Sequence, residues 1–349
     1  MFYKKIPTLS AANILYIGAS TGGSLKKVKA LKRLGHKVAL IDPYKFFRWK
    51  NLVGKWTYDT GALFLEYFLK LRIAPLIAGN YFDIIFIDGG EFFGPYSLKY
   101  LKKSTKVIIN YNNDDPFSKR DRNKWRLYLK AIPYYNLIVV VREVNVAEAH
   151  SYGAQKVLRV FMSGDELDGP RDITEEEKAA LGSEVLFVGT WMPERGPFLA
   201  QLVLAGLPLS IYGNRWKKAP EWNILKYAWK GGPRYDDDYI KLIQSAKITL
   251  GLLSKGNRDL HTYRTMEIPH AGGFFCAERT SEHLQLYEED VEAVFWADAR
   301  ECLEKCLKYL KDDARRQLIA ENSRRRCLAN GIFNENVLAK VINEALNYN

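Results

Sequence analysis

The segment 13–42, NILYIGASTGGSLKKVKALKRLGHKVALID, constrains the fold of this chain more than any other stretch. A short apolar run predicts a buried strand, and a glycine-rich loop follows it. Apolar residues then recur at helical spacing until Gly35, and KVALID begins a second strand. A strand, a crossover helix and a second strand form a βαβ unit, which implies a parallel sheet.

The same alternation of strand and helix continues along the chain and restarts once. Further strands are predicted at 83–90, 106–114, 136–142 and 156–162, and then at 184–191, 207–214, 247–253, 274–277 and 292–298. Helices are predicted at 236–245, 299–329 and 334–348. Between the two series lies 163–183, which is polar, acidic and rich in glycine and proline, as is typical of a linker.

The fold class that follows is α/β, with two tandem Rossmann-like domains and a cleft between them. With 349 residues, the chain is too long for one small core. We expect an acceptor-side domain at 1–165, a linker at 166–183, a second domain at 184–330 and a final helix at 331–349. That last helix could pack back on the first domain.

The net charge indicates the class of binding partner, and the cysteines bear on metal binding and the cellular compartment. Lysine and arginine number 52 against 40 acidic residues, a net charge of +12, which favours anionic partners such as phosphates, nucleic acid or an acidic membrane surface. The chain has four cysteines: Cys276, Cys302, Cys306 and Cys327. They lack the spacing of a zinc site, so we expect no metal and a reducing compartment. Without a recognisable signal peptide or spanning segment, the expected location is cytoplasmic, with peripheral contact at the inner membrane face left open.

The stretch 259–275, DLHTYRTMEIPHAGGFF, carries the densest chemistry. It follows a predicted strand, where open parallel sheets bind ligands. A helix beginning near Thr262 would offer its N-terminus to an anion. The side chains expected around that end are His261, Thr262, Tyr263 and Arg264. Glu267 would lie one turn into the helix and could accept ribose hydroxyls; alternatively, it is a structural partner of Arg264.

Within this stretch, an R-x-x-E-x-P-x-x-G-G run is complete: Arg264, Glu267, Pro269, Gly272 and Gly273. The run resembles the signature of GT-B glycosyltransferases, in particular the CgeB-like (spore-maturation-protein-like) branch of the group 1 glycosyl transferases. The resemblance extends over about 184–330. It implies a GT-B fold and transfer of a sugar from a nucleotide-diphosphate donor to an acceptor hydroxyl, in bacterial cell-surface polysaccharide or glycoconjugate synthesis. It also implies no metal and no cofactor, with the nucleotide sugar as a substrate.

The resemblance assigns donor-side roles in the second domain. Glu267 would bind the ribose, and Asp259, eight residues earlier, would lie near the donor sugar as a candidate catalytic residue. Arg195 and Thr190 would contact the diphosphate, although Arg195 could instead be a solvated charge at a helix start.

The loops of the second domain complete the predicted donor site. Gly189 would permit close approach of the backbone to the ligand. Gly213 and Tyr235 belong to the loops that resemble those holding the base, and Tyr235 could stack on it. The aspartates at 236–238 are interpreted as an acidic first helical turn.

In the first domain, the glycine loop is expected to face the cleft: Gly22, Gly23 and Ser24. Ser20 occupies the second position of a G-x-G-x-x-G pattern, so the loop is a weak dinucleotide fingerprint. In INYNNDDPF, Asp114 or Asp115 could deprotonate the acceptor, or could form an Asx turn before Pro116. Weaker candidates are Asp88, Glu91 and His150.

Several alternatives remain open. The segment 43–56, PYKFFRWKNLVGKW, could contact a membrane or a lipid-linked acceptor, or could be a surface loop that packs its aromatic side chains. A nucleotide-sugar epimerase, a non-catalytic binding protein and a nucleic-acid-binding protein are rival functions. The basic runs 119–126 and 324–326 suggest the last of these, but two α/β domains without a nucleic-acid-binding motif argue against it. The expected partners are a nucleotide-diphosphate sugar and a glycan, lipid-linked or protein acceptor.

Overall fold

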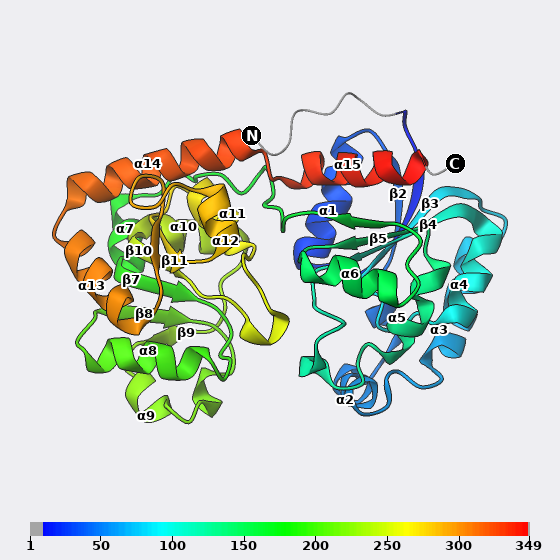
Figure 1. Ribbon diagram of the computed structural model, residues 1–349, viewed down its shortest axis with the longest axis horizontal. Helices are drawn as coiled ribbons and strands as arrows, with labels where there is room; N and C mark the ends of the chain where they lie inside the picture. The colour runs from blue at the N-terminus through cyan, green and yellow to red at the C-terminus, as the bar shows by residue number, and fades with distance from the viewer. Residues whose placement is uncertain (1–9, 348–349) are drawn as a thin grey trace. The chain divides into compact units, whose positions relative to one another are not determined.

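The computed structural model describes residues 10–347, which form two compact units (Figure 1). The N-terminal unit contains residues 10–165, 256–258 and 333–347, and the C-terminal unit contains residues 166–255 and 259–332. Each unit has one parallel six-stranded sheet. The predicted α/β class with two Rossmann-like halves is therefore confirmed.

The sheet of the N-terminal unit has the strand order β2-β1-β3-β4-β5-β6. Its strands are β1 (Asn13–Ile17), β2 (Lys37–Ile41), β3 (Phe82–Asp88), β4 (Thr105–Asn112), β5 (Leu137–Val140) and β6 (Val157–Arg159). Its helices are α1 (Gly22–Arg33), α2 (Lys50–Thr60), α3 (Leu65–Ile77), α4 (Pro95–Leu101), α5 (Arg126–Ala131), α6 (Val144–Ser151) and α15 (Asn334–Leu346). The strand order switches sides after β2, because β3 pairs in parallel with the free edge of β1.

The sheet of the C-terminal unit has the order β12-β11-β10-β7-β8-β9. Its strands are β7 (Ser183–Val188), β8 (Leu209–Tyr212), β9 (Trp229–Gly231), β10 (Ala246–Gly251), β11 (Phe275–Glu278) and β12 (Val294–Trp296). Its helices are α7 (Glu175–Leu181), α8 (Arg195–Leu204), α9 (Trp222–Leu225), α10 (Asp236–Ser245), α11 (Arg264–His270), α12 (Ser281–Leu286), α13 (Ala299–Leu310) and α14 (Asp313–Asn330). The switch in strand order lies between β7 and β10.

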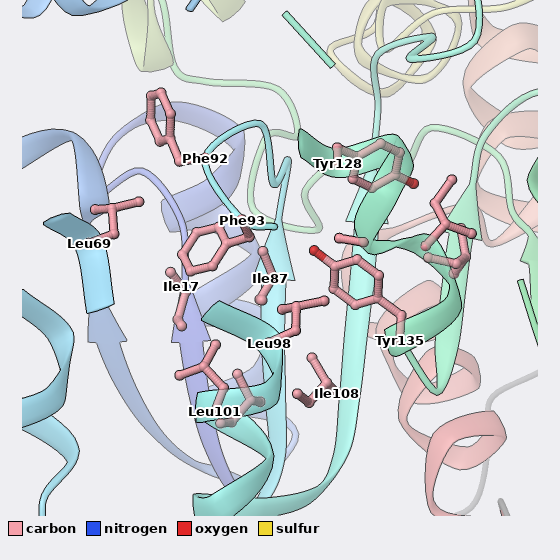
Figure 2. Close-up of a cluster of buried hydrophobic side chains, with 14 of the residues drawn as sticks. Ile17, Leu69, Ile87, Phe92, Phe93, Leu98, Leu101, Ile108, Tyr128 and Tyr135 are labelled. Carbon is pink, nitrogen blue, oxygen red and sulfur yellow. The ribbon is translucent and has the colours of Figure 1, made fainter. Parts of the chain in front are cut away.

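Buried apolar side chains from the strands, from the flanking helices and from the loops between them form the core of the N-terminal unit (Figure 2). Strand β3 reads FDIIFID and is buried along most of its length, as expected for a central parallel strand. In Figure 2, Phe93 lies among Ile17 and Ile87, whereas Phe92 lies apart from them. The loop after β3 therefore contributes two aromatic rings to the same buried cluster, at different places in it.

The last helix, α15, packs against α1 inside the N-terminal unit (Figure 1). Asn334 at its start accepts a hydrogen bond from Ser163 Oγ at 2.7 Å and donates one to Asp165 Oδ2 at 3.0 Å. Its backbone N–H donates to the carbonyl of Gly164 at 2.9 Å. The two chain segments at 163–165 and 333–334 are thus tied together by buried polar groups.

Some predicted elements differ from the structure. The single helix expected at 299–329 is wrong, because the chain breaks between α13 and α14, where Asp312 caps α14 by accepting from Arg315 N–H at 2.9 Å. The surface-loop alternative for 43–56 is wrong for its second half, which lies in α2. Short edge strand β9 was not predicted. Helix α7, with a capping box at Thr174 and Glu177, lies in the stretch interpreted as a linker.

Candidate functional site

The loops after β7 and β8 approach each other at two glycines. Gly213 has φ of 146°, and a Cβ there would lie 2.0 Å from the carbonyl oxygen of Gly189. The same oxygen accepts a hydrogen bond from Trp216 Nε1 at 2.8 Å. Gly213 is therefore required by both its backbone conformation and the lack of space. The two predicted glycines, Gly189 and Gly213, therefore allow the loops after β7 and β8 to pack closely at the carboxyl edge of the sheet.

Arg195 is buried at the start of α8 and spans two βα loops. Its guanidinium donates to the carbonyls of Thr190 at 3.0 Å, Leu252 at 3.1 Å and Leu253 at 3.3 Å. Burial, and then the neighbouring charge of Arg264, lower the pKa of Arg195 to about 10. The side chain is thus a buried cation held by carbonyl oxygens, not the solvated charge of the alternative interpretation.

Arg264 and Glu267 both lie at this edge, on α11. Arg264 Nε donates to the carbonyl of Val188, the last residue of β7, at 2.7 Å. Glu267 is half-buried, and its Oε2 accepts a hydrogen bond from Tyr239 on α10 at 3.2 Å. Burial and the adjacent Glu267 carboxylate raise the pKa of Tyr239, so the phenol stays protonated. Sequence reasoning missed Tyr239, which lies 28 residues before its partner.

The turn before α11 is held by its own side chains. Thr262 N–H donates to Thr265 Oγ1 at 3.1 Å, and Arg264 N–H donates to Thr262 Oγ1 at 3.3 Å. Helix α11 begins at Arg264, two residues after the predicted start, with Tyr263 at the N-cap position. These reciprocal bonds engage part of the helix start that was expected to bind an anion.

His261 lies beneath this turn and is buried. Its Nδ1 pairs with the carboxylate of Glu282 on α12. A second buried imidazole, His283, lies between the Glu278 carbonyl, 2.6 Å from Nδ1, and Thr265 Oγ1, 3.0 Å from Nε2. Since a carbonyl only accepts, Nδ1 carries the proton and Nε2 accepts from the hydroxyl. Burial lowers the pKa of His283 to about 4, so it is neutral at pH 7.

Two remaining donor-side candidates differ in exposure. Asp259 is buried, and its backbone N–H donates to the Ser254 carbonyl at 3.2 Å. Its charge is one of those that oppose the lowering of the Arg195 pKa. Tyr235 is 67% exposed at the N-cap of α10. The aspartates at 236–238 form the first turn of α10, as predicted.

In the N-terminal unit, the predicted glycine loop opens α1. Gly22, with φ of 56°, and Gly23 are both exposed, and a Cβ at either position would meet no atom within 4 Å. Ser24 Oγ donates instead to Tyr16 OH at 3.3 Å, and Tyr16 donates to Asp88 Oδ2 at 2.6 Å. Ser24 therefore contacts the interior of the unit, while the two glycines face solvent.

Asp114 and Asp115, which follow β4, have different surroundings. Asp115 is fully buried and accepts from the N–H groups of Phe117 and Ser118, both at 3.2 Å, which is the geometry of the Asx turn. It also pairs with Arg258, which belongs to the same unit, at 2.6 Å. The Asp114 side chain is 38% exposed and accepts from Lys124 Nζ at 3.2 Å.

The adjoining loop after β3 holds a further acidic residue. Glu91 is buried, and its Oε1 accepts from Tyr44 OH at 2.6 Å. Burial, followed by the Glu91 charge, raises the pKa of Tyr44. Glu91 was only a weak candidate in the sequence, because the residues near it in the chain do not indicate its partner. Tyr44 lies 47 residues earlier.

Comparison with known proteins gives one family match over part of the chain. Residues 195–340 match the "glycosyl transferase-like" family, and these residues include Arg195, Arg264 and Glu267. A search of curated proteins found no match to the chain. Within residues 10–347, the helices are all too short or too polar to cross a membrane.

Solved structures resemble the chain over nearly its full length at low identity. Sucrose-phosphate synthase of Thermosynechococcus elongatus superposes with a TM-score of 0.67 at 11% identity, covering 95% of this chain and 97% of that one. HepE of Anabaena, solved with UDP and glucose, gives 0.62 at 11% identity, covering 95% and 100%. The UDP-forming trehalose-phosphate synthase of Burkholderia vietnamiensis gives 0.62 at 11%, with the same two coverages. These similarities show that the chain has the GT-B fold.

Proposed function

We propose that this protein is a glycosyltransferase that moves a sugar from a nucleoside-diphosphate donor to an acceptor hydroxyl. The observation that supports this most directly is the half-buried Glu267 carboxylate, oriented by Tyr239 at the carboxyl edge of the C-terminal sheet. Open α/β sheets bind nucleotides at that edge, and a carboxylate there accepts ribose hydroxyls. The matched segment 195–340 contains the whole arrangement.

Different residues of the C-terminal unit would bind different parts of the donor. Glu267 would accept the ribose hydroxyls, and the exposed ring of Tyr235 would stack on the base. Arg264 lies one turn before Glu267 and would pair with the diphosphate. Arg195 is already bonded to carbonyls, so its main contribution would be positive charge and a rigid loop, with a remaining Nη1–H as a donor.

The proposed reaction breaks the bond between the anomeric carbon of the sugar and the β-phosphate oxygen. A new bond forms between that carbon and the acceptor oxygen, and the acceptor proton leaves to a base. The nucleoside diphosphate departs with an added negative charge, which Arg264 and Arg195 would stabilise in the transition state without a bound metal. Asp259, close to Arg195, would lie beside the donor sugar.

Of the two adjacent aspartates, we propose Asp114 as the one available to take a proton. Its side chain is 38% exposed and lies near two cations, Lys124 Nζ at 3.2 Å and Arg120 Nη2 at 4.0 Å. Asp115, by contrast, is enclosed by two backbone N–H groups, Asn145 and Arg258, and we assign it to positioning the loop after β4.

The cellular role is proposed from the resemblance noted in the sequence: the CgeB-like branch, and synthesis of a cell-surface polysaccharide or glycoconjugate in the cytoplasm. Peripheral membrane contact is supported by α2 and the residues before it, where Trp49 is 67% and Leu52 64% exposed. Between Pro43 and Ile77 the chain carries six basic and two acidic residues, which suits an anionic surface.

The test is binding followed by turnover. Thermal shift against UDP, GDP, dTDP, ADP and CMP should show a rise of several degrees with one of the nucleoside diphosphates, and Glu267→Ala should abolish it. The matching nucleotide sugar should then release its nucleotide in the presence of an acceptor. Interconversion of the nucleotide sugar without release would show an epimerase instead. Absence of any shift would contradict the donor site.

A further inference from the structure

An apolar pocket opens in the N-terminal unit, next to the carboxyl ends of β2, β3 and β4. Its volume is about 170 Å³. The walls come from the loop after β2, from α2 and from the loop after β3: Tyr44, Phe47, Val53, Gly54, Tyr58 and Phe92. All these residues lie in one compact unit. The pocket therefore occupies the edge of a parallel sheet where such folds bind ligands.

The aromatic walls are held by one another. Phe92 contacts Tyr44 edge-on, with ring centroids 5.3 Å apart, and contacts Phe47 in the same way at 5.4 Å. Phe47 in turn stacks on Phe68 of α3 at 5.4 Å. Phe92 belongs to the buried cluster shown in Figure 2 and also lines the pocket. A preformed apolar wall lowers the entropy cost of binding an apolar group.

Two charged residues, Glu91 and Lys124, line the pocket, and both are largely buried. Tyr44 OH donates to Glu91 Oε1 at 2.6 Å, while Lys124 Nζ donates to Asp114 Oδ2 at 3.2 Å. The pocket thus joins an aromatic cavity to a carboxylate and an ammonium group, and the ammonium group contacts the aspartate proposed to take the acceptor proton.

The wall formed by α2 contains a glycine that the helix does not need. Gly54 lies mid-helix, and a Cβ there would meet no atom within 4 Å. Glycine in a helix interior costs about 1 kcal/mol relative to alanine. Neither crowding nor a left-handed backbone explains its presence, and its effect is to leave the pocket wall without a side chain.

We propose that this pocket binds the apolar group of the acceptor, an aryl ring or a short alkyl chain, and presents its hydroxyl to Glu91 and Lys124. This inference rests on the proposed glycosyltransferase function. The volume fits one ring, since a cavity of about 150 Å³ holds benzene. A bare sugar needs hydrogen bonds around its whole edge, whereas most of the side chains that line this pocket are apolar or aromatic. The apolar lining therefore selects an acceptor in which the hydroxyl is attached to a hydrophobic group.

Direct binding of small probes to the full chain tests the pocket. Titration calorimetry would compare phenol, 1-hexanol and glucose, with benzene as the ring without a hydroxyl. We expect phenol or 1-hexanol to bind at least tenfold more tightly than glucose, and the comparison of the two identifies the aryl or the alkyl source. For the probe that binds, Glu91→Gln should weaken binding of the alcohol severalfold and leave binding of benzene unchanged. Stronger binding of glucose than of both alcohols would overturn the proposal.

Substitution at Gly54 provides the decisive variant. Gly54→Leu should fill the pocket and reduce alcohol binding at least tenfold, and its melting temperature should not fall, because a Cβ at this position meets no atom within 4 Å and helix propensity improves. Gly54→Ala, a smaller plug, provides an intermediate case if the leucine variant folds poorly. Asn51→Leu, exposed on the same helix outside the pocket, is the matched control and should bind normally.

Nucleotide binding measured on the same samples separates the two proposals. Gly54→Leu should keep the thermal shift with nucleotide, because Gly54 belongs to the other unit from Glu267. A nucleotide shift without alcohol binding would overturn the pocket proposal alone. A third outcome is that the chain binds no nucleotide but binds an alcohol, and that Gly54→Leu abolishes the alcohol binding. This result would support the pocket as a binding site but contradict the glycosyltransferase function, on which the acceptor role of the pocket rests. Alcohol binding that is unchanged in Gly54→Leu would place the ligand elsewhere and overturn the proposal.

Discussion

Tyr239 donates a hydrogen bond to Oε2 of Glu267 at 3.2 Å, joining α10 to α11. The pKa of the phenol is raised by burial and by the carboxylate, so the donor keeps its proton through the physiological range. A fixed donor on one oxygen restricts the rotation of the carboxylate. Glu267 is therefore held in one orientation before any ligand arrives, which reduces the entropy cost of binding a ribose.

Removing either partner should weaken nucleotide affinity by different amounts. Tyr239→Phe loses one hydrogen bond, worth about 1 kcal/mol, and should raise the dissociation constant about fivefold. Glu267→Gln loses the charged acceptor, worth about 1.5–3 kcal/mol, and should raise the dissociation constant about 10- to 150-fold. Titration calorimetry with the nucleotide found by thermal shift measures both. Tyr227→Phe, at a tyrosine that is 75% exposed, is the matched control. Equal affinities in all the variants would show that the pair serves only the fold.

Arg195 should matter for stability as well as for binding. Arg195→Met removes the donors to three carbonyls and leaves those buried acceptors unpaired, at about 1–3 kcal/mol each. We expect the free energy of unfolding to fall by about 3 kcal/mol or more in a denaturant titration. Arg300→Met, at a side chain that is 87% exposed, should change it by less than about 0.5 kcal/mol. Similar losses at the two positions would mean that the carbonyl contacts contribute little.

Because His283 is buried and neutral, we expect the free energy of unfolding to decrease in mild acid. Its pKa is lowered by burial to about 4, whereas an unfolded histidine titrates near 6.5. Between these values the unfolded chain takes up a proton that the folded chain does not, so acid favours unfolding. The free energy of unfolding should fall by about 3 kcal/mol as the pH drops from 6.5 to 4. Denaturant titrations across this range measure the slope.

A substitution identifies the source of that slope. In His283→Asn the pH dependence should be flatter over the same range, although the variant will be less stable at pH 7. Part of the slope should remain, because burial also lowers the pKa of His36. A slope identical to that of the parent protein would show that His283 does not cause it.

The fold class could be predicted because the strands are short apolar runs separated by helical patterns. Strand β3 and helix α10 (Asp236–Ser245) were recognisable from buried periodicity and from an acidic first turn. The edge strand β9 could not be predicted, since its three residues carry no alternation and pair with β8 only at a bulge. Helix α2 was obscured by Gly54, which lowers helix propensity in the middle of the segment.

The candidate site was only partly predictable for a different reason. Arg264 and Glu267 belong to one local run, so their spacing alone places them one helical turn apart. Tyr239 and the carbonyls bonded to Arg195 reach the site through tertiary packing, which no local pattern reports. The pocket beside Glu91 likewise combines three loops. Its residues could be identified only after the sheet brought those loops to one edge.

The exposed apolar side chains at α2 lead to a prediction about membranes. Leu52 is 64% exposed in a segment with a basic surplus, whereas Leu204 is 71% exposed on α8 in the C-terminal unit. An apolar side chain inserts into the interface, and the nearby basic residues attract anionic headgroups. Leu52→Ser combined with Trp49→Ser should reduce sedimentation with phosphatidylglycerol vesicles severalfold, and Leu204→Ser should not. Since the attraction is partly electrostatic, phosphatidylcholine vesicles should bind the parent protein less. Equal sedimentation of all three proteins with both lipids would contradict a docking role for α2.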